Sequence, residues 1–166
     1  MIDFHRMKQS YMKYKFENVR PVDAVYATEM EILSLLDRLG FPMYEMGTYM
    51  YMKLIFNVAD KMKVIDADDN DSCLELMAQV SEIHSLVYRD TCSKLDADLG
   101  LFHREINRAI SLIDESMIDE SLLNLVCSEN ENGLHYGELA FSLSLVVLGL
   151  KKEKKNKLVR IRSLDK

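Results

Sequence analysis

The chain has 166 residues, of which 48% are hydrophobic and 29% are charged, a balance typical of a globular protein rather than a disordered or fibrous one. Its two prolines and six glycines are too few for an all-β chain, which needs a turn about every 8 to 12 residues. No apolar run approaches the roughly 20 residues that cross a bilayer, and the first twenty residues do not form a signal peptide. We therefore expect an all-α, cytoplasmic protein that does not enter a membrane.

The net charge of −6 is unevenly distributed along the chain. Residues 1–20 hold five basic and two acidic side chains, and residues 151–166 hold eight basic and two acidic ones. Since the whole chain has 21 basic and 27 acidic residues, residues 21–150 carry 8 basic against 23 acidic groups. Such a region attracts nucleic acid poorly, because neutralising phosphate supplies the sequence-independent affinity. The two basic ends of the chain could supply the attraction for nucleic acid that the acidic middle lacks.

The sequence gives no sign of a metal site or of an enzyme. The three cysteines are far apart and form no C-x-x-C pair, which argues against a disulfide framework and a zinc site. The four histidines do not combine with Cys, Asp or Glu at metal-ligand spacing, and there is neither a nucleophile elbow nor a glycine-rich phosphate loop. We expect a non-enzymatic protein with no cofactor, no metal and no small-molecule substrate.

The chain divides into three parts by its patterns. Residues 1–21 show no clean period and are expected to form an N-terminal arm. Residues 22–150 show helical periodicity and are expected to form one compact domain. Residues 151–166 form a basic tail. Helices are predicted over residues 22–39, 51–62, 73–85, 86–95, 99–114, 119–126 and 137–150.

The acidic run at residues 66–72 is superficially similar to a calcium-binding loop. Such a loop needs glycine at its sixth position and a bidentate glutamate at its twelfth, where this sequence has Asp71 and Met77. We interpret the run as a solvated loop whose carboxylates help to start the next helix, because the helix dipole favours negative charge there.

The helix predicted over residues 99–114 is the clearest in the chain. Its apolar residues recur at i, i+4, i+7, i+8 and i+11, so one side faces the core. A short helix, residues 86–95, and a turn, residues 96–98, precede it, and Asp98 is a good N-cap. Two helices joined by such a turn are typical of a helix-turn-helix. The opposite side of the second helix carries Leu101, Arg104, Asn107, Arg108 and Ser111, with His103 at its edge.

The residue types on this outward side suit the reading of DNA bases. Arginine can contact guanine bidentately, and asparagine can do the same for adenine. Arg104 and Arg108 are four residues apart and Asn107 lies between them, so all three project from one side of the helix. By periodicity alone, the same residues also fit an ordinary solvated surface.

Two blocks of the chain resemble the DNA-binding effector domain of the stage-zero sporulation protein A family, a family of response regulators. The first block is Leu39-Gly40-Phe41-Pro42 followed by Gly47 and Ile55, which contains the family's G-x-P-x-x-x-x-G element. The second block consists of Tyr88, Asp90, Lys94, Asp96, Phe102, Arg104, Ile106, Ala109 and Ile110. Between the two blocks this chain is longer than the family by about fifteen residues. A further element around Gly137-Glu138-Leu139-Ala140 is similar to the family's last helix, and the resemblance covers about residues 30–150 in all.

The resemblance implies an all-helical fold with a helix-turn-helix that binds promoter DNA, often as tandem copies. Members of the family carry a phospho-receiver domain before this region, whereas only some thirty residues precede it here, so phosphorylation control is not implied. The recognition helix also departs from the family. It has Leu101 in place of an arginine, His103 in place of a glutamate and Arg108 in place of a histidine, and it keeps Arg104.

We predict a transcriptional regulator or accessory factor that binds double-stranded DNA through its helix-turn-helix. The alternative is a protein-binding module on the same scaffold that engages a protein partner, or a second copy, through an acidic and methionine-rich surface. The basic tail, residues 151–166, would bind phosphates. Alternatively, it would continue the last helix in solvent or form ion pairs with the acidic middle of the chain. The residues predicted to contact bases are Arg104, Arg108, Asn107, His103 and Ser111, and those predicted to contact phosphates are Lys151, Lys152, Lys154 and Lys155. The methionines, which could equally pack in the core, are Met43, Met46, Met50 and Met52.

Overall fold

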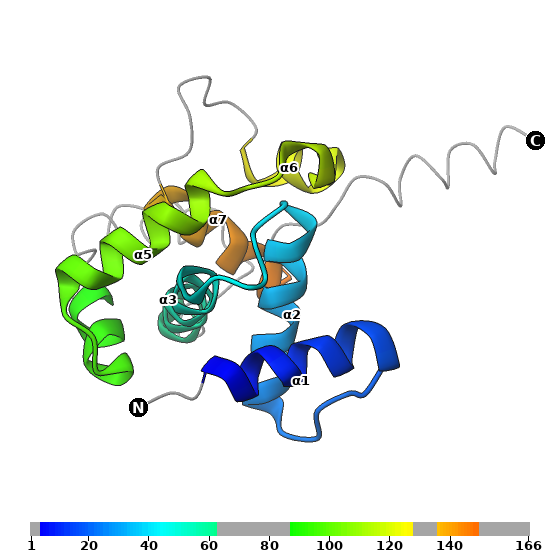
Figure 1. Ribbon diagram of the computed structural model, residues 1–166, viewed down its shortest axis with the longest axis horizontal. Helices are drawn as coiled ribbons and strands as arrows, with labels where there is room; N and C mark the ends of the chain where they lie inside the picture. Colours follow the sequence, from blue (N-terminus) through cyan, green and yellow to red (C-terminus); the bar gives the residue numbers. More distant parts are fainter. Residues whose placement is uncertain (1–3, 63–86, 128–135, 150–166) are drawn as a thin grey trace, which may run out of the picture.

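The computed structural model describes residues 4–62, 87–127 and 136–149 (Figure 1). All regular elements in these ranges are helical, which confirms the expected all-α class. They are α1 (Phe4–Glu17), α2 (Ala24–Arg38), α3 (Met46–Met62), α5 (Leu99–Ser111), the 3-10 helix η1 (Glu115–Met117), α6 (Glu120–Val126) and α7 (Tyr136–Val147), and residues 87–95 are helical as well.

Three predicted features lie outside the described residues. They are the acidic run at residues 66–72, the helix at residues 73–85 and the basic tail at residues 151–166. None of the described helices combines the length and the apolar character that a membrane span requires.

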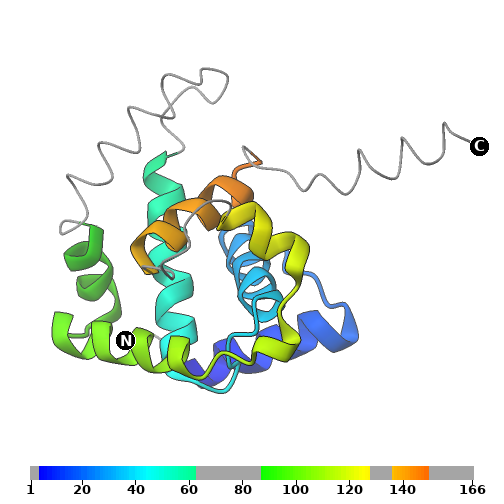
Figure 2. The same cartoon turned by 90° about the horizontal axis from the view of Figure 1, so that it is seen from above.

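Helix α3 is the central element of the fold. Helices α2, α5 and α7 pack around it (Figures 1 and 2). A helix enclosed on several sides has apolar residues all around rather than along one stripe, and twelve of the 17 residues of α3 are buried. Met50 and Met52 belong to this core, with 2% and 0% of their surface exposed, whereas Met46 is 45% exposed. Core packing therefore accounts for most of the methionine-rich segment.

Helix α1 (Phe4–Glu17) occupies most of the stretch that the sequence predicted as an arm. Met7 and Tyr11, one turn apart, are 6% and 2% exposed, and α1 packs against α2. The hydroxyl of Tyr11 donates a hydrogen bond of 2.7 Å to Oδ2 of Asp37 on α2, and Lys15 forms an ion pair with the same carboxylate. Burial, together with this hydrogen bond, raises the pKa of Tyr11 well above its ordinary value. Helix α1 is therefore joined to the domain by both apolar and polar contacts.

Two glycines, one after the end of α2 and one in the first turn of α3, allow a close approach to α5 and to the residue Asp114 after it. Gly40 ends α2 with a φ of +83°, and its carbonyl accepts a hydrogen bond of 3.0 Å from the N–H of Asp114. A Cβ atom at Gly40 would lie 2.5 Å from the carbonyl oxygen of Asp114, and one at Gly47 would overlap the carbonyl oxygen of Glu105. Both positions therefore require glycine, and they fix where α5 lies on α3.

Candidate nucleic-acid interface

The site is built on residues 87–95 and α5, two helices joined by a short turn. Asp96 ends the first helix with a φ of +53°, and the N–H of Ala97 donates to the carbonyl of Cys92 at 3.0 Å, as in a Schellman motif. Asp98 then caps α5, its side chain accepting a hydrogen bond of 2.8 Å from the N–H of Leu101. The turn and the cap therefore lie where the sequence predicted them.

A buried polar network holds the first of these helices against α3. The side-chain amide of Asn57, which is 3% exposed, donates hydrogen bonds of 2.9 Å to Oδ2 of Asp90 and to Oγ1 of Thr91. The bond from Asn57, and then the hydrogen bond and positive charge of Lys94, lower the pKa of Asp90. Sequence periodicity did not indicate Asn57, because it is a polar residue among apolar neighbours.

One side of α5 is anchored in the core. Phe102, Ile106 and Ala109 follow one another at i, i+4 and i+7, and each is 0% exposed. Helix α3 packs directly against α5, and the ring of Tyr136 at the start of α7 lies against the ring of His103. The opposite side is consequently the one that a partner can reach.

The outward side of α5 carries the polar residues expected there. Arg104, Asn107, Arg108 and Ser111 are all exposed. Arg104 forms no ion pair with any residue that the structure describes. The hydroxyl of Ser111 donates to the carbonyl of Arg108 at 2.6 Å, a contact within the same helix. The structure therefore brings four of the five predicted base-contacting residues together on one open surface.

Arg108 has a carboxylate partner that the sequence did not reveal. Its Nε lies 3.3 Å from Oε2 of Glu45, which precedes α3. The side chain of Glu45 is 17% exposed and that of Arg108 is 63% exposed. The contact to Nε leaves most of the guanidinium accessible to solvent, so the arginine is oriented rather than buried.

His103, the fifth predicted residue, is turned toward the body of the protein. It is half-buried, and its Nδ1 shares a hydrogen bond with the hydroxyl of Tyr136 at the start of α7. Its ring also packs edge-on to that of Tyr88, with 5.4 Å between the centroids. Burial raises the pKa of Tyr88 to about 12, so that phenol stays protonated beside the imidazole. In this arrangement His103 supports the junction of α5 and α7 and is not part of the outward side.

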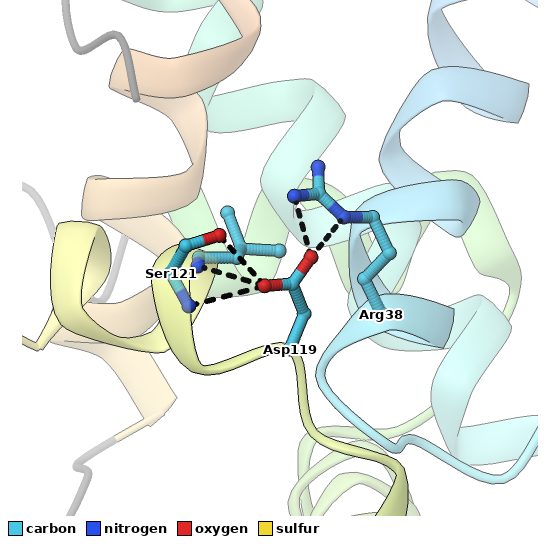
Figure 3. Close-up of polar contacts among 4 residues, drawn as sticks. Arg38, Asp119 and Ser121 are labelled. Carbon is cyan, nitrogen blue, oxygen red and sulfur yellow. Dashed lines mark hydrogen bonds and ion pairs between the residues drawn. The ribbon is translucent and has the colours of Figure 1, made fainter. Parts of the chain in front are cut away.

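The chain that follows α5 is fastened to the end of α2 (Figure 3). Asp119 accepts hydrogen bonds from Nε and Nη2 of Arg38, at 3.1 and 2.8 Å, and its N–H donates to the Arg38 carbonyl at 2.7 Å. Its other carboxylate oxygen accepts from the hydroxyl and the N–H of Ser121 and caps α6. The bond from Ser121 and then the bond from Arg38 lower the pKa of Asp119 to about 2.

Comparisons with known proteins gave no match: no protein-family model, no curated protein and no solved structure is significantly similar to this chain. Among the residues that the structure describes, no three His, Cys, Asp or Glu side chains gather as metal ligands do. The predicted phosphate contacts Lys151, Lys152, Lys154 and Lys155 lie outside these residues.

Proposed function

We propose that this chain is a DNA-binding transcriptional regulator or accessory factor that places α5 in the major groove of duplex DNA. The observation that carries the proposal is the two-sided character of α5. Phe102, Ile106 and Ala109 fix the helix in the core, while arginine and asparagine side chains stand exposed on its other side. A major groove about 12 Å wide admits one helix, and these two residue types read guanine and adenine.

The surroundings of α5 support the same proposal. Residues 87–95 and the capped turn at Asp98 precede α5, as in helix-turn-helix proteins, where the first helix crosses the DNA backbone and the second enters the groove. The resemblance to the sporulation regulator family, inferred from the sequence, implies a DNA-reading role for this same helix. Because the middle of the chain is acidic, we expect weak binding to arbitrary duplexes, so base contacts must supply much of the affinity.

The experiment is a duplex selection with the full chain, followed by fluorescence anisotropy on selected and scrambled duplexes at two salt concentrations. Each bidentate arginine contact contributes about 1 to 3 kcal/mol of discrimination. Arg104→Ala and Arg108→Ala should therefore each reduce the preference for the selected duplex by roughly 5-fold to 150-fold. Arg20→Ala, which removes an exposed cation that follows α1 and lies over the ring of Tyr14, is the control and should leave the preference unchanged. Absence of duplex binding at low salt, or indifference to both arginine changes, would overturn the proposal.

A protein-binding role is the second candidate, and a group of exposed apolar residues favours it. The contacts at Gly40 and Gly47 bring the segment before α3 next to the end of α5. These two stretches carry exposed apolar side chains of a kind enriched at protein interfaces. If this role is correct, no duplex will be selected, and Tyr44→Ser with Met46→Ser will shift the self-association measured by sedimentation equilibrium. The exposed residues are Tyr44 (67%), Met46 (45%), Leu112 (40%) and Met117 (65%).

A further inference from the structure

The exposed apolar side chains gather in two groups. Nine large apolar side chains are exposed among the described residues, and all but Leu99 belong to one of these groups. Such clusters mark contact surfaces more often than scattered apolar residues do. The first group extends from the end of α1 through the connection to the first turn of α2, and its members are Phe16, Val19, Val22 and Val25. The second lies around the start of α3 and after the end of α5, and its members are Tyr44, Met46, Leu112 and Met117.

Positive charge surrounds the first group. Residues 4–25 hold five basic and two acidic side chains, and Lys15 among them is paired with Asp37 on α2. Lys13 and Arg20 are exposed, and Lys13 forms no ion pair with any residue that the structure describes. The two carboxylates, which reduce the positive charge without reversing it, are Glu17 and Asp23. We call the first group, together with Lys13 and Arg20, the basic surface.

Negative charge surrounds the second group. Residues 109–127 hold four acidic side chains and no basic one. Asp119 is paired with Arg38 at the end of α2, so three exposed carboxylates remain in the stretch that carries Leu112 and Met117. They are those of Asp114, Glu115 and Glu120. We call the second group, together with these three carboxylates, the acidic surface.

Helix α2 holds parts of the two surfaces apart within one molecule. Val25 belongs to the first turn of α2, whereas Arg38 in its last turn binds Asp119. A helix advances about 1.5 Å per residue, so roughly 20 Å separate these two points of α2. Figure 1 shows the connection between α1 and α2 at the bottom of the molecule and α6 at the top. The start of α2 therefore cannot cover the acidic surface of its own molecule.

We propose that the basic surface of one copy of this chain docks head-to-tail on the acidic surface of a second copy. Each surface presents four exposed apolar side chains, and the charges around them are opposite. Complementary charge selects the partner and speeds association, while burial of the apolar side chains supplies affinity. Such a contact joins two different surfaces, so a third copy can add to a pair. It is compatible with duplex binding by α5, because Arg104 and Asn107 belong to neither surface.

The test measures self-association of the full chain by sedimentation equilibrium without DNA. The parent should associate beyond a dimer as its concentration rises, and less so at higher salt, which screens the charges. The basic-surface variant, Lys13→Gln plus Val22→Ser, and the acidic-surface variant, Met117→Ser plus Glu120→Gln, should each associate roughly 20-fold more weakly. All four side chains are exposed, so circular dichroism of both variants should match that of the parent.

A mixture of the two variants is the decisive measurement. One variant keeps its acidic surface and the other keeps its basic surface, so an equimolar mixture should form dimers with the affinity of the parent contact and should grow no further. The matched control is Arg89→Gln plus Leu99→Ser, which removes an exposed cation and the exposed apolar side chain outside the two groups. This control should associate as the parent does.

Three results would overturn the inference. They are a parent chain that stays monomeric at low salt, a mixture that associates no more tightly than either variant alone, and a control that is weakened as much as the surface variants. Each result is independent of the duplex selection, since no DNA is present. Failure of duplex binding by α5 therefore leaves this contact standing, and failure of this contact leaves the role of α5 standing.

Discussion

Glu45 is a carboxylate placed beside a side chain that we propose to read DNA. An exposed ion pair contributes only about 0 to 1 kcal/mol to stability, so the pair with Arg108 has little effect on folding. Its geometry has another consequence. Because Glu45 engages Nε of Arg108 at 3.3 Å, it restrains a long, flexible side chain while most of the guanidinium remains exposed. We interpret Glu45 as a positioning residue for Arg108.

Replacing Glu45 by glutamine should therefore reduce base discrimination rather than stability. In the Glu45→Gln variant Arg108 loses its charged partner, and the ratio of selected to scrambled affinity should fall by about 3-fold to 10-fold, part of the 1 to 3 kcal/mol that a bidentate contact provides. Scrambled duplexes should bind slightly more tightly, because one negative charge is removed. Glu115→Gln, an exposed carboxylate in η1, is the control. If both duplexes gain equally in the Glu45→Gln variant, Glu45 acts only through its charge.

Asp119 gives the fold a predictable dependence on pH. Its pKa of about 2 in the folded chain lies below the ordinary value of 3.8, so folding favours the ionised carboxylate. This stabilisation is fully present above about pH 4 and is lost as the pH falls toward 2. Asp119→Asn keeps a helix cap but loses the charge, so it should lower the free energy of unfolding near pH 7 by about 1 kcal/mol. The expected loss of stability is modest because the side chains of Asp119 and Arg38 are each about one third exposed.

Chemical denaturation at several pH values measures this effect. The parent should lose more stability than Asp119→Asn between pH 4 and pH 2. Asp23→Asn is the control, since Asp23 caps α2 in the same way but forms no ion pair with the described residues. Equal losses in the parent and in Asp119→Asn over this range would contradict the assignment to Asp119.

At the scale of elements, the crossing of α3 and α5 depends on a backbone contact at Gly47. A methyl group there would overlap the Glu105 carbonyl and approach Cβ of Ala109 to 3.1 Å. Gly47→Ala should therefore push the helices apart and destabilise the fold by about 1 to 3 kcal/mol, despite the higher helix propensity of alanine. Gly100→Ala, where the nearest contact is a side-chain oxygen of Asp98 at 3.2 Å, should change the free energy of unfolding by less. Thermal denaturation of both variants compares them, and equal midpoints would contradict the proposed close approach.

The sequence predicted α5 and its cap well, but it placed the start of α3 too late and missed α1. Helix α5 and its cap Asp98 were found because a clear apolar stripe opposes a polar side. The start of α3 was placed at residue 51 instead of Met46, since a helix buried all around shows no stripe. Helix α1 was missed although Phe4, Met7, Tyr11 and Tyr14 have helical spacing, because other apolar residues interrupt the pattern.

At the candidate site, the sequence predicted which residues share one side of α5 but not which residues of other segments contact them. Arg104, Asn107, Arg108 and Ser111 were placed on the outward side from spacing alone, and the structure shows them exposed there. Glu45 lies 63 residues from Arg108, the side chain that it contacts. Tyr136 lies 33 residues from its partner His103. No local pattern predicts such pairs, because they exist only after α3 and α7 have packed against α5.

At the scale of the whole molecule, the packing of α1 (Phe4–Glu17) against α2 predicts that this helix unfolds together with the core. Tyr11 is 2% exposed and its hydroxyl donates to Asp37 on α2. Loss of such a hydrogen bond to a charged group costs about 1.5 to 3 kcal/mol. In a two-state domain this cost appears in the global unfolding transition, whereas a change in an independent arm leaves that transition where it was.

Tyr11→Phe should therefore lower the midpoint of a single thermal transition, by about 2 to 4 °C for each kcal/mol lost. Differential scanning calorimetry of the full chain measures it. Tyr14→Phe is the matched control in the same helix, because Tyr14 is half-buried and the structure shows its ring against Tyr11 and Arg20 rather than its hydroxyl in a hydrogen bond. An unchanged midpoint in Tyr11→Phe, or a separate early transition, would mean that α1 folds apart from the rest. In that case the packing of α1 against α2 does not couple this helix to the core around α3.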